Sequence, residues 1–165
     1  MKAGIGLGSN TGSRLENLRS ALSWLETVSH TPLLCSPVYE TEPVDCSEGT
    51  PYFLNAVCEI SYQADPAVLL RKMRAFERER GRTTGSAKNS PRPLDMDLLY
   101  ADDLVVQTEE LTLPHPRMLE RRFVLQPLSD IRPALILPHT TQTIQSILTS
   151  LNDSSRVKLF HETLR

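Results

Sequence analysis

Two aspartates separated by a single residue lie inside an apolar run, in the segment PRPLDMDLLY at residues 91–100. Alternate side chains of an extended strand share a face, so Asp95 and Asp97 would point together, away from the leucines and methionine around them. Two carboxylates this close repel one another unless a cation compensates them. Hard oxygen ligands with no Cys or His nearby favour Mg²⁺ or Mn²⁺ over zinc. The pair predicts a divalent-cation site, although any half-exposed amphipathic strand would show the same alternation.

Basic side chains gather immediately before this strand, at Arg78, Arg80, Arg82, Lys88 and Arg92. A guanidinium forks onto phosphate oxygens, and Mg²⁺ commonly shares its coordination between carboxylates and substrate phosphates. The combination predicts a nucleotide-phosphate site in which Arg82 and Arg92, which bracket the loop, contact the phosphates. Arg78 and Arg80 could equally be the solvated end of a helix.

The glycine-rich stretch GIGLGSNTGS near the N-terminus resembles a dinucleotide-binding loop only superficially. Gly4, Gly6 and Gly8 alternate, so G-x-G-x-x-G cannot be laid over them, and no acidic residue closes a second strand about 20 residues later. The sequence also contains no G-K-S or G-K-T, which excludes a P-loop. Alternating glycines in a strand indicate instead that another backbone or a ligand approaches closely.

Length and charge describe an ordinary globular chain. Its 165 residues suit one domain, residues 1–165, and a net charge of −2 gives no general attraction to nucleic acid or to anionic membranes. No apolar run approaches the ~20 residues of a membrane helix, and the first residues lack a secretory signal. Three cysteines without a C-x-x-C pair are typical of reduced thiols. We therefore expect a cytoplasmic protein with neither membrane nor nucleic-acid partners.

Hydrophobic periodicity predicts an alternating α+β chain. The expected elements are strand 2–7, helix 13–28, strands 33–40 and 53–61 joined by the long loop 41–52, a helix from Asp65-Pro66 to Gly81, strand 94–100, a hairpin strand at 104–107 and a last helix at 141–151. Ser13 and Glu16 form a capping-box pattern, and residues 114–140 are punctuated by prolines and expected to be irregular. The β-α-β-β-α-β order predicts a ferredoxin-like α+β sandwich, an antiparallel sheet with helices packed on it and extra C-terminal elements.

Seven short motifs occur along the chain in a fixed order, namely GLGSN, YETEPV, FLNAV, FERERGR, PRPLDMDLL, LPHPRM and RRFVLQPL. In this order they resemble the family of 6-hydroxymethyl-7,8-dihydropterin pyrophosphokinases, from about residue 4 to residue 150. The resemblance implies the ferredoxin-like fold inferred above. It also implies transfer of pyrophosphate from ATP, the co-substrate, to the hydroxymethyl group of a dihydropterin, a step of folate biosynthesis.

The resemblance implies a role for individual residues. Asp95 and Asp97 resemble the ligands of two Mg²⁺ ions, and Arg82 and Arg92 resemble catalytic, phosphate-binding arginines. Further positions near the ATP are Glu77, Leu98, Thr112 and His115. The pterin positions are Thr41, Pro43, Val44, Phe53, Asn55 and Phe123, with the two phenylalanines on either side of the ring.

Several of these positions have a simpler explanation. Phe53 and Phe123 could be plain core residues, and His115 between two prolines could be a turn residue. Asn55 is harder to explain, because an amide on a buried strand face needs polar partners. The chain departs from the family pattern at Thr84, Asn89, Ser90, Met96 and Glu110.

Two other classes of function stay open at this point. One is a catalytically impaired pterin- or nucleotide-binding protein, which the loop departures would permit. The other is an RNA-binding ferredoxin-like module, which would need aromatic residues on adjacent strands. The partners expected from the resemblance are small molecules only, ATP and hydroxymethyl-dihydropterin, and a monomer is favoured.

Overall fold

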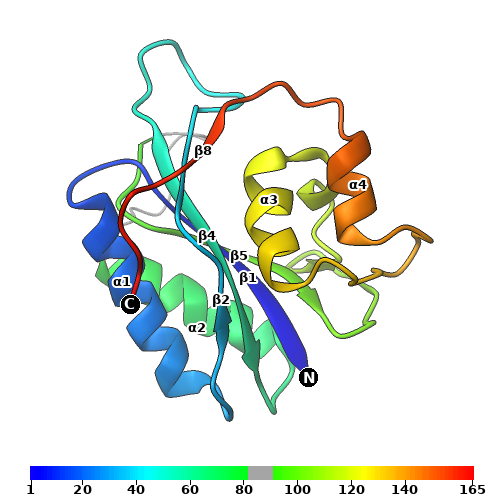
Figure 1. Cartoon of the computed structure of the whole chain (residues 1–165). Coiled ribbons are helices and arrows are strands. Elements are labelled where there is room, and N and C mark those ends of the chain that lie inside the picture. The colour runs from blue at the N-terminus through cyan, green and yellow to red at the C-terminus, as the bar shows by residue number, and fades with distance from the viewer. Residues whose placement is uncertain (82–90) are drawn as a thin grey trace.

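A large antiparallel sheet organises the molecule (Figure 1). The computed structural model describes residues 1–81 and 91–165. The sheet has the order β5-β1-β4-β3-β8, and β2 also pairs with β4. Its strands are β1 (Lys2–Ser9), β2 (Leu34–Cys35), β3 (Tyr39–Thr41), β4 (Phe53–Ser61), β5 (Asp95–Ala101) and β8 (Val157–Leu159). Strand β1 is central, antiparallel to β4 on one side and to β5 on the other, which is the ferredoxin-like arrangement.

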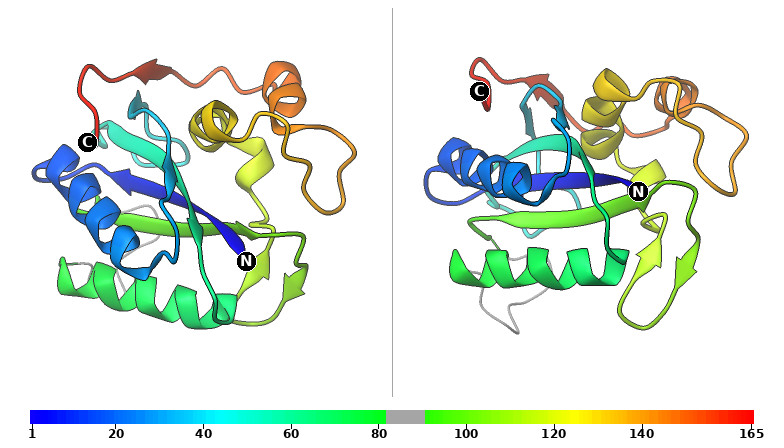
Figure 2. Two further views of the ribbon diagram at one scale, coloured as in Figure 1. Left: turned by 60° about the horizontal axis from the view of Figure 1, so that its bottom comes forward. Right: turned by 90° about the horizontal axis from the view of Figure 1, so that it is seen from below.

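The two faces of the sheet carry different helices, as Figure 2 shows. Helices α1 (Arg14–Val28) and α2 (Pro66–Glu79) cover one face, and α3 (Arg122–Ile131) and α4 (Ile144–Ser150) pack on the other. Each face has its own hydrophobic core. The larger core lies under α1 and α2, and the smaller lies between α3, α4 and strands β4 and β5.

Strand β1 explains why the glycines alternate. Ala3, Ile5 and Leu7 are buried in the core beneath α1 and α2. The glycines at positions 4, 6 and 8 therefore point to the opposite face, where they leave β1 without side chains. An added Cβ on Gly4 would lie 2.1 Å from Cε1 of Tyr100, so the Tyr100 ring occupies the space that Gly4 leaves.

The first two helices follow their sequence patterns closely. Helix α1 buries Leu18, Leu22 and Leu25, as its spacing predicts. Helix α2 begins with Asp65 as N-cap, whose side chain accepts a hydrogen bond from the Ala67 N–H at 2.7 Å. The capping box predicted for α1 is wrong: Ser13 is the N-cap residue, but its side chain makes no capping bond.

The proline-rich segment 114–140 was expected to be irregular, and this expectation is wrong. It contains a short 3₁₀ helix, η1 (Met118–Glu120), and helix α3. Pro127 lies inside α3 and lacks the N–H that would bond to the carbonyl of Phe123. Burial of Val124, Leu125 and Leu128 against the sheet offsets that missing bond.

Smaller differences concern short strands. The expected strand 33–40 is divided into β2 and β3, with Pro37 between them. The segment at 104–107 does not pair back with β5: strand β6 (Val106–Gln107) pairs with β7 (Thr112–Leu113) in a separate two-stranded sheet. Strand β8, which the sequence did not reveal, pairs with β3. The last helix lies within its predicted range, as α4.

Helix α3 is held to the rest of the molecule at both ends. Near its N-terminus the backbone N–H of Arg122 donates to Asp153 at 2.9 Å. Near its C-terminus the hydroxyl of Tyr39 on β3 donates to Asp130 at 2.6 Å. Burial and the Asp130 carboxylate raise the pKa of Tyr39 to about 12, so the hydroxyl keeps its proton for this bond.

A buried carboxylate adds a third attachment just past the end of α3. Glu59 on β4 is 4% exposed. It accepts a hydrogen bond from the Tyr100 hydroxyl at 2.6 Å and another from Nε of Arg132 at 3.0 Å. A buried carboxylate needs such partners, so this network links β4, β5 and α3.

We expect Gly4→Ala to lower the free energy of unfolding by about 3 kcal/mol, because the new methyl group must displace the Tyr100 ring. The matched variant is Gly6→Ala, whose Cβ would lie 3.6 Å from Cδ2 of Leu99, an ordinary van der Waals contact. Its free energy of unfolding should stay within about 1 kcal/mol of wild type. Urea denaturation measures both. Equal losses in the two variants would show that Tyr100 is not what requires Gly4.

Candidate active site

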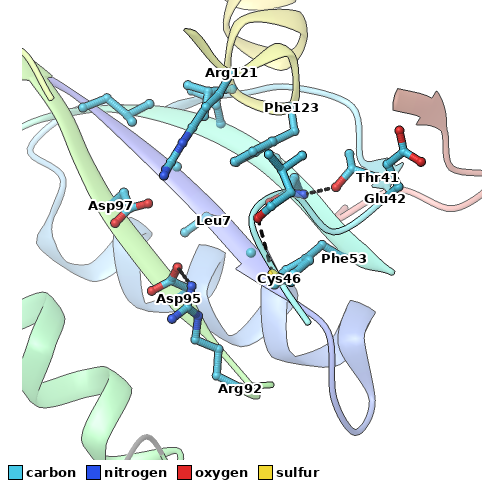
Figure 3. Close-up of a pocket in the computed structure, with 18 residues that line it drawn as sticks. Leu7, Thr41, Glu42, Cys46, Phe53, Arg92, Asp95, Asp97, Arg121 and Phe123 are labelled. Atoms are coloured by element: carbon cyan, nitrogen blue, oxygen red, sulfur yellow. Dashed lines mark hydrogen bonds and ion pairs between the residues drawn. The ribbon is translucent and has the colours of Figure 1, made fainter. Parts of the chain in front are cut away.

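A pocket opens on the face of the sheet opposite α1 and α2 (Figure 3). Strand β5 supplies Asp95 and Asp97, β1 supplies Gly6 and Gly8, and β4 supplies Phe53, Asn55 and Val57. The end of β3 supplies Thr41, and the loop after β3 supplies Glu42, Val44 and Cys46. The N-terminus of α3 supplies Arg121, Phe123 and Val124, and the segment before β5 supplies Arg92. The acidic residues and the aromatic residues predicted from the sequence thus line the same pocket.

The acidic side of the pocket is strand β5. Asp95 and Asp97 alternate with Met96 and Leu98, which are buried in the core beneath the helices. Both carboxylates therefore point into the pocket, as the sequence pattern predicts. Nη2 of Arg92 lies 3.0 Å from Oδ2 of Asp95, so an arginine meets the carboxylate pair inside the pocket. Nε of Arg92 is buried and has no hydrogen-bond partner within the described part of the chain.

Asn10 holds the backbone of Arg92. Oδ1 of Asn10 accepts a hydrogen bond from the Arg92 N–H at 2.8 Å, and the Asn10 N–H donates to the Arg92 carbonyl at 3.3 Å. Asn10 is 2% exposed. This residue follows directly on β1, so the end of β1 fixes the point at which Arg92 approaches Asp95.

The opposite side of the pocket carries aromatic and amide groups. Phe53 and Asn55 alternate on β4, so both side chains reach the same face. Nδ2 of Asn55 donates to Oγ1 of Thr41 at 2.5 Å, which fixes the orientation of the amide. Asn55 is therefore a buried, oriented amide, as the sequence argument required.

The loop between β3 and β4 forms the outer wall. Glu42, Val44 and Cys46 line the pocket, and Pro43 lies between two of them in the chain. Asp45 is tied to Arg117 by an ion pair of 2.5 Å, which connects this loop to the segment before η1. The unusual length of the loop is thus explained by its contribution to the pocket.

The N-terminus of α3 forms the roof. Arg121 is the N-cap residue of α3, and Phe123 lies two residues further on. Figure 3 shows both side chains descending from α3 towards the strands, with Arg121 on the side of Asp97. Burial and the neighbouring Arg117 lower the pKa of Arg121, while Asp97 and Asp95 act in the opposite direction. An arginine remains charged at neutral pH, so Arg121 brings a second cation to the carboxylates.

Four of the residues expected near a nucleotide do not line this pocket with their side chains. Glu77 is 2% exposed, and its Oε1 accepts a hydrogen bond from the Met96 N–H, between the two aspartates, at 2.6 Å. It thereby supports β5 from the outer edge of the sheet. Leu98 is buried beneath the helices, so a contact from Leu98 to a nucleotide would have to come from its backbone.

Thr112 and His115 lie beside β5. Thr112 is exposed on β7, a strand that contacts β5. His115 is half-buried, its N–H donates to the Leu99 carbonyl at 2.7 Å, and its Nδ1 accepts from the Arg117 N–H at 3.2 Å. The Met96 N–H and the Leu99 carbonyl both point to this outer edge. A nucleotide site along the edge of β5 stays a prediction for these four residues.

Some predicted positions lie outside the described residues, among them Arg82 and the departures Thr84, Asn89 and Ser90. The other two departures are accommodated. Met96 is 4% exposed in the helix-side core, and Glu110 pairs with Arg71 at 3.0 Å.

Four residues of the site were missed by sequence reasoning, namely Glu42, Cys46 and Arg121, which line the pocket, and Asn10, which holds the backbone of Arg92. Asn10 belongs to the motif GLGSN and Arg121 to the motif RRFVLQPL. Both motifs carry the resemblance to the family, so Asn10 and Arg121 could have been chosen as candidate site residues on that basis.

The chemistry of the donor set fits Mg²⁺. Within residues 1–81 and 91–165 no group of three or more His, Cys, Asp or Glu side chains is placed to hold a metal ion alone. Mg²⁺ is usually bound through one or two carboxylates, with water and substrate phosphates completing the octahedron. Asp95 and Asp97 match that requirement, provided that a phosphate ligand supplies the other oxygens.

The ferredoxin-like domain thus has a pocket with carboxylates and arginines at one end and phenylalanines with a fixed amide at the other. Such a pocket suits a polyphosphate beside a flat heterocycle. The model of the family 7,8-dihydro-6-hydroxymethylpterin-pyrophosphokinase (HPPK) matches residues 4–133. The chain belongs to this family.

Named relatives agree with the family assignment. The 2-amino-4-hydroxy-6-hydroxymethyldihydropteridine pyrophosphokinase of Porphyromonas gingivalis is 43% identical over 134 residues, 79% of this chain and 90% of the relative. The enzyme of the same name from Haemophilus influenzae is 34% identical over 156 residues, 94% of this chain and 96% of the relative. The folic acid synthesis protein fol1 of Schizosaccharomyces pombe is 39% identical over 157 residues, 94% of this chain. The chain spans only 21% of the length of fol1.

Solved structures support the fold. The wild-type HPPK-DHPS of Plasmodium falciparum with pteroate superposes with a TM-score of 0.69 at 15% identity, over 90% of this chain and 42% of that one. An HPPK-DHPS in complex with substrates gives a TM-score of 0.70 at 15% identity, over 90% of this chain and 43% of that one.

Among residues 1–81 and 91–165, none of the helices has both the length and the apolar character of a membrane span.

We expect His115 to titrate below its ordinary pKa of 6.5, because burial and the charges of Arg121 and Arg117 lower the pKa, while Asp95 opposes them only partly. The unfolded chain then binds a proton at His115 near pH 6.5, whereas the folded chain binds that proton only at a lower pH. The free energy of unfolding should therefore fall as the pH drops below about 6.5, by at most about 1.4 kcal/mol per pH unit from this group.

The measurement compares wild type with His115→Gln by urea denaturation at pH 7 and pH 5.5, together with an NMR titration of the His115 ring. The variant should lose less stability between the two pH values. Parallel pH dependence of the two proteins, or an NMR midpoint above 6.5, would contradict the assignment.

Proposed function

We propose that this chain transfers pyrophosphate from ATP to the hydroxymethyl group of 6-hydroxymethyl-7,8-dihydropterin, releasing AMP, with Mg²⁺ as the required metal. One observation carries the proposal: the carboxylate pair on β5 and the aromatic-amide group on β4 open into the same pocket, with only β1 between them. Residues 1–165 are proposed to act as one catalytic domain, because β8 near the C-terminal end pairs with β3.

The pterin half of the site is supported by its chemistry. A flat, polar heterocycle needs aromatic faces against its ring and fixed hydrogen-bonding groups at its rim. Phe53 and Phe123 provide the faces. Asn55, oriented by Thr41, provides an amide, and the backbone around Val44 provides further donors and acceptors.

The phosphate half is supported by its charges. Asp95 and Asp97 would hold two Mg²⁺ ions together with the phosphates of ATP. Bound Mg²⁺ would supply neutralisation of the phosphate charge and a lower pKa for the attacking hydroxyl. Arg92 and Arg121, on either side of the carboxylates, would bind non-bridging phosphate oxygens through their N–H groups.

The chemistry follows from placement. In the proposed step the pterin hydroxyl oxygen forms a bond to the β-phosphorus of ATP, and the bond from that phosphorus to the oxygen of AMP breaks. Such transfer depends on in-line positioning and on charge neutralisation, and it needs no protein nucleophile. The residues on β4 and α3 orient the alcohol, while those on β5 and at Arg92 orient the triphosphate.

We expect Asp97→Ala to lower kcat at least about 100-fold, because charge stabilisation by a bound metal contributes several kcal/mol. Release of AMP from ATP, Mg²⁺ and hydroxymethyl-dihydropterin is the measured quantity. Asp103→Ala removes an exposed carboxylate in the turn after β5 and serves as the matched control, with an unchanged rate expected. Near-normal turnover in Asp97→Ala would remove the metal-pair proposal.

Phe123→Ala should weaken pterin binding about 10–100-fold while leaving the affinity for an ATP analogue unchanged, since stacking of a ring on an aromatic side chain contributes about 1–3 kcal/mol. Calorimetric titration with each ligand separately gives the two affinities. Equal losses for both ligands would mean that the roof of the pocket has collapsed, and the stacking role would be rejected.

A further inference from the structure

Two cysteines that are distant in the chain face each other across two paired strands. Cys35 on β2 is the register partner of Cys58 on β4. Their Sγ atoms lie 3.2 Å apart, and the S–H of Cys58 donates a hydrogen bond to the sulfur of Cys35. Cys58 belongs to the larger core beneath α1 and α2, and Cys35 packs against that core. The two thiols therefore lie on the face of the sheet opposite the pocket.

The strand pairing brings these side chains close together. The N–H of Ser36 donates to the carbonyl of Val57 at 2.9 Å, so Ser36 and Val57 form a hydrogen-bonded pair. Hydrogen-bonded and non-hydrogen-bonded pairs alternate along antiparallel strands, which makes Cys35 and Cys58 a non-hydrogen-bonded pair. The Cα atoms of such a pair are about 4.5 Å apart, within the range that a disulfide bond spans. Bringing the sulfurs closer by roughly 1 Å is enough to bond them.

The two thiols differ in access and in acidity. Cys58 is 0% exposed, whereas Cys35 is half-buried. The hydrogen bond from Cys58 lowers the pKa of Cys35, and the charge of Arg165 adds to this effect, against burial and the charge of Glu26. The same hydrogen bond, together with burial, raises the pKa of Cys58. Cys35 is thus the thiol that ionises more readily and meets solvent, the two properties of a reactive cysteine.

A zinc site does not explain the pair. Structural zinc takes four Cys or His ligands, and the described ranges 1–81 and 91–165 hold no group of three or more His, Cys, Asp or Glu side chains placed for a metal ion. The third cysteine of the chain, Cys46, lines the pocket, and its Sγ donates to the Val44 carbonyl at 3.4 Å. Cys46 therefore lies apart from the pair and serves as an internal comparison.

We propose that Cys35 and Cys58 form a redox modification site, at which a peroxide oxidises the two thiols to an intramolecular disulfide. First, the Cys35 thiolate attacks one oxygen of hydrogen peroxide, the O–O bond breaks, and Cys35 becomes a sulfenic acid. The other oxygen takes up the proton that Cys35 released and leaves as water.

Second, the sulfur of Cys58 attacks the sulfur of Cys35 and the S–O bond breaks. The sulfenic oxygen leaves with the Cys58 proton as a second water molecule. Two thiols and one hydrogen peroxide thus give one disulfide and two water molecules. A dithiol reductant reverses the change by thiol–disulfide exchange.

The disulfide would close a covalent loop around the wall of the pocket. Residues 35–58 comprise β3, the loop 41–52 and the part of β4 that carries Phe53 and Asn55. Strand β2 has only two residues, so few backbone hydrogen bonds attach it to β4. A bond between Cys35 and Cys58 restricts the unfolded chain over this loop and thereby stabilises the folded one. This consequence does not depend on the proposed function.

The test treats the reduced full chain with a small molar excess of hydrogen peroxide. Wild type should lose two of its three free thiols and about 2 Da of mass. Peptide mapping should place the new bond between Cys35 and Cys58. The Tm should rise by about 5–10 °C, as expected for a disulfide that closes a loop of this length, and dithiothreitol should reverse the rise. Cys46→Ser should show the same loss of mass and the same rise in Tm.

Cys35→Ser and Cys58→Ala are the matched controls, and each removes one partner of the pair. Peroxide should give neither variant a disulfide nor a higher Tm, and either variant alone is sufficient if the other does not fold. The inference is wrong if peroxide leaves wild type with three free thiols, adds oxygen to Cys35 without forming the bond, or links Cys46 instead. A Cys35–Cys58 disulfide that leaves the Tm unchanged or lowers it would overturn the stabilising role. None of these measurements requires turnover, so a failure of the proposed function would be recognised separately.

Discussion

Two negative charges on one face of one strand are the constraint on which the site depends. Asp95 and Asp97 must share the pocket face, because side chains alternate along a strand and Met96 and Leu98 are buried on the other face. Two arginines from other segments bring positive charge to these carboxylates, Arg92 before β5 and Arg121 at the start of α3. The pocket therefore holds carboxylates and guanidinium groups beside two glycines of β1. This arrangement suits a ligand that brings its own phosphates and metal ions.

The sheet separates stability from function by its two faces. The face beneath α1 and α2 holds the larger core, to which β1 contributes Ala3, Ile5 and Leu7. The opposite face is only partly covered, and the glycines of β1 keep its centre open. Helix α3 completes that face, and its attachments through Asp130, Arg132 and Arg122 hold the N-terminus that carries Arg121 and Phe123. Contacts outside the pocket thus help to position Arg121 and Phe123 over the strands.

Sequence periodicity predicted the elements that bury one apolar face, β1, α1, β4, α2 and β5, and with them the ferredoxin-like order. It failed where tertiary packing overrides a local signal. Helix α3 was missed because Pro127 disfavours a helix locally, while the burial of Leu125 and Leu128 becomes evident only against the folded sheet. The Ser13 capping bond was expected from a pattern that α1 satisfies in spacing but not in geometry.

The site divides in the same way. The carboxylates on β5 and the pair Phe53 and Asn55 on β4 could be predicted, since each set depends only on alternation within one strand. Their proximity does not follow from alternation, because it depends on the register that pairs Gly8 with both Asp95 and Asn55. Arg121 and Asn10 were missed for the same reason: each acts on a partner that is distant in the chain.

The central claim, that Asp95 and Asp97 hold the metal ions of a bound triphosphate, is tested most directly by a crystal soaked with Mn²⁺ and α,β-methylene ATP. Anomalous scattering locates Mn²⁺ independently of any interpretation of the pocket. The account predicts anomalous peaks in contact with carboxylate oxygens of both aspartates and with phosphate oxygens of the nucleotide. A well-ordered nucleotide whose Mn²⁺ ions touch neither aspartate would contradict it.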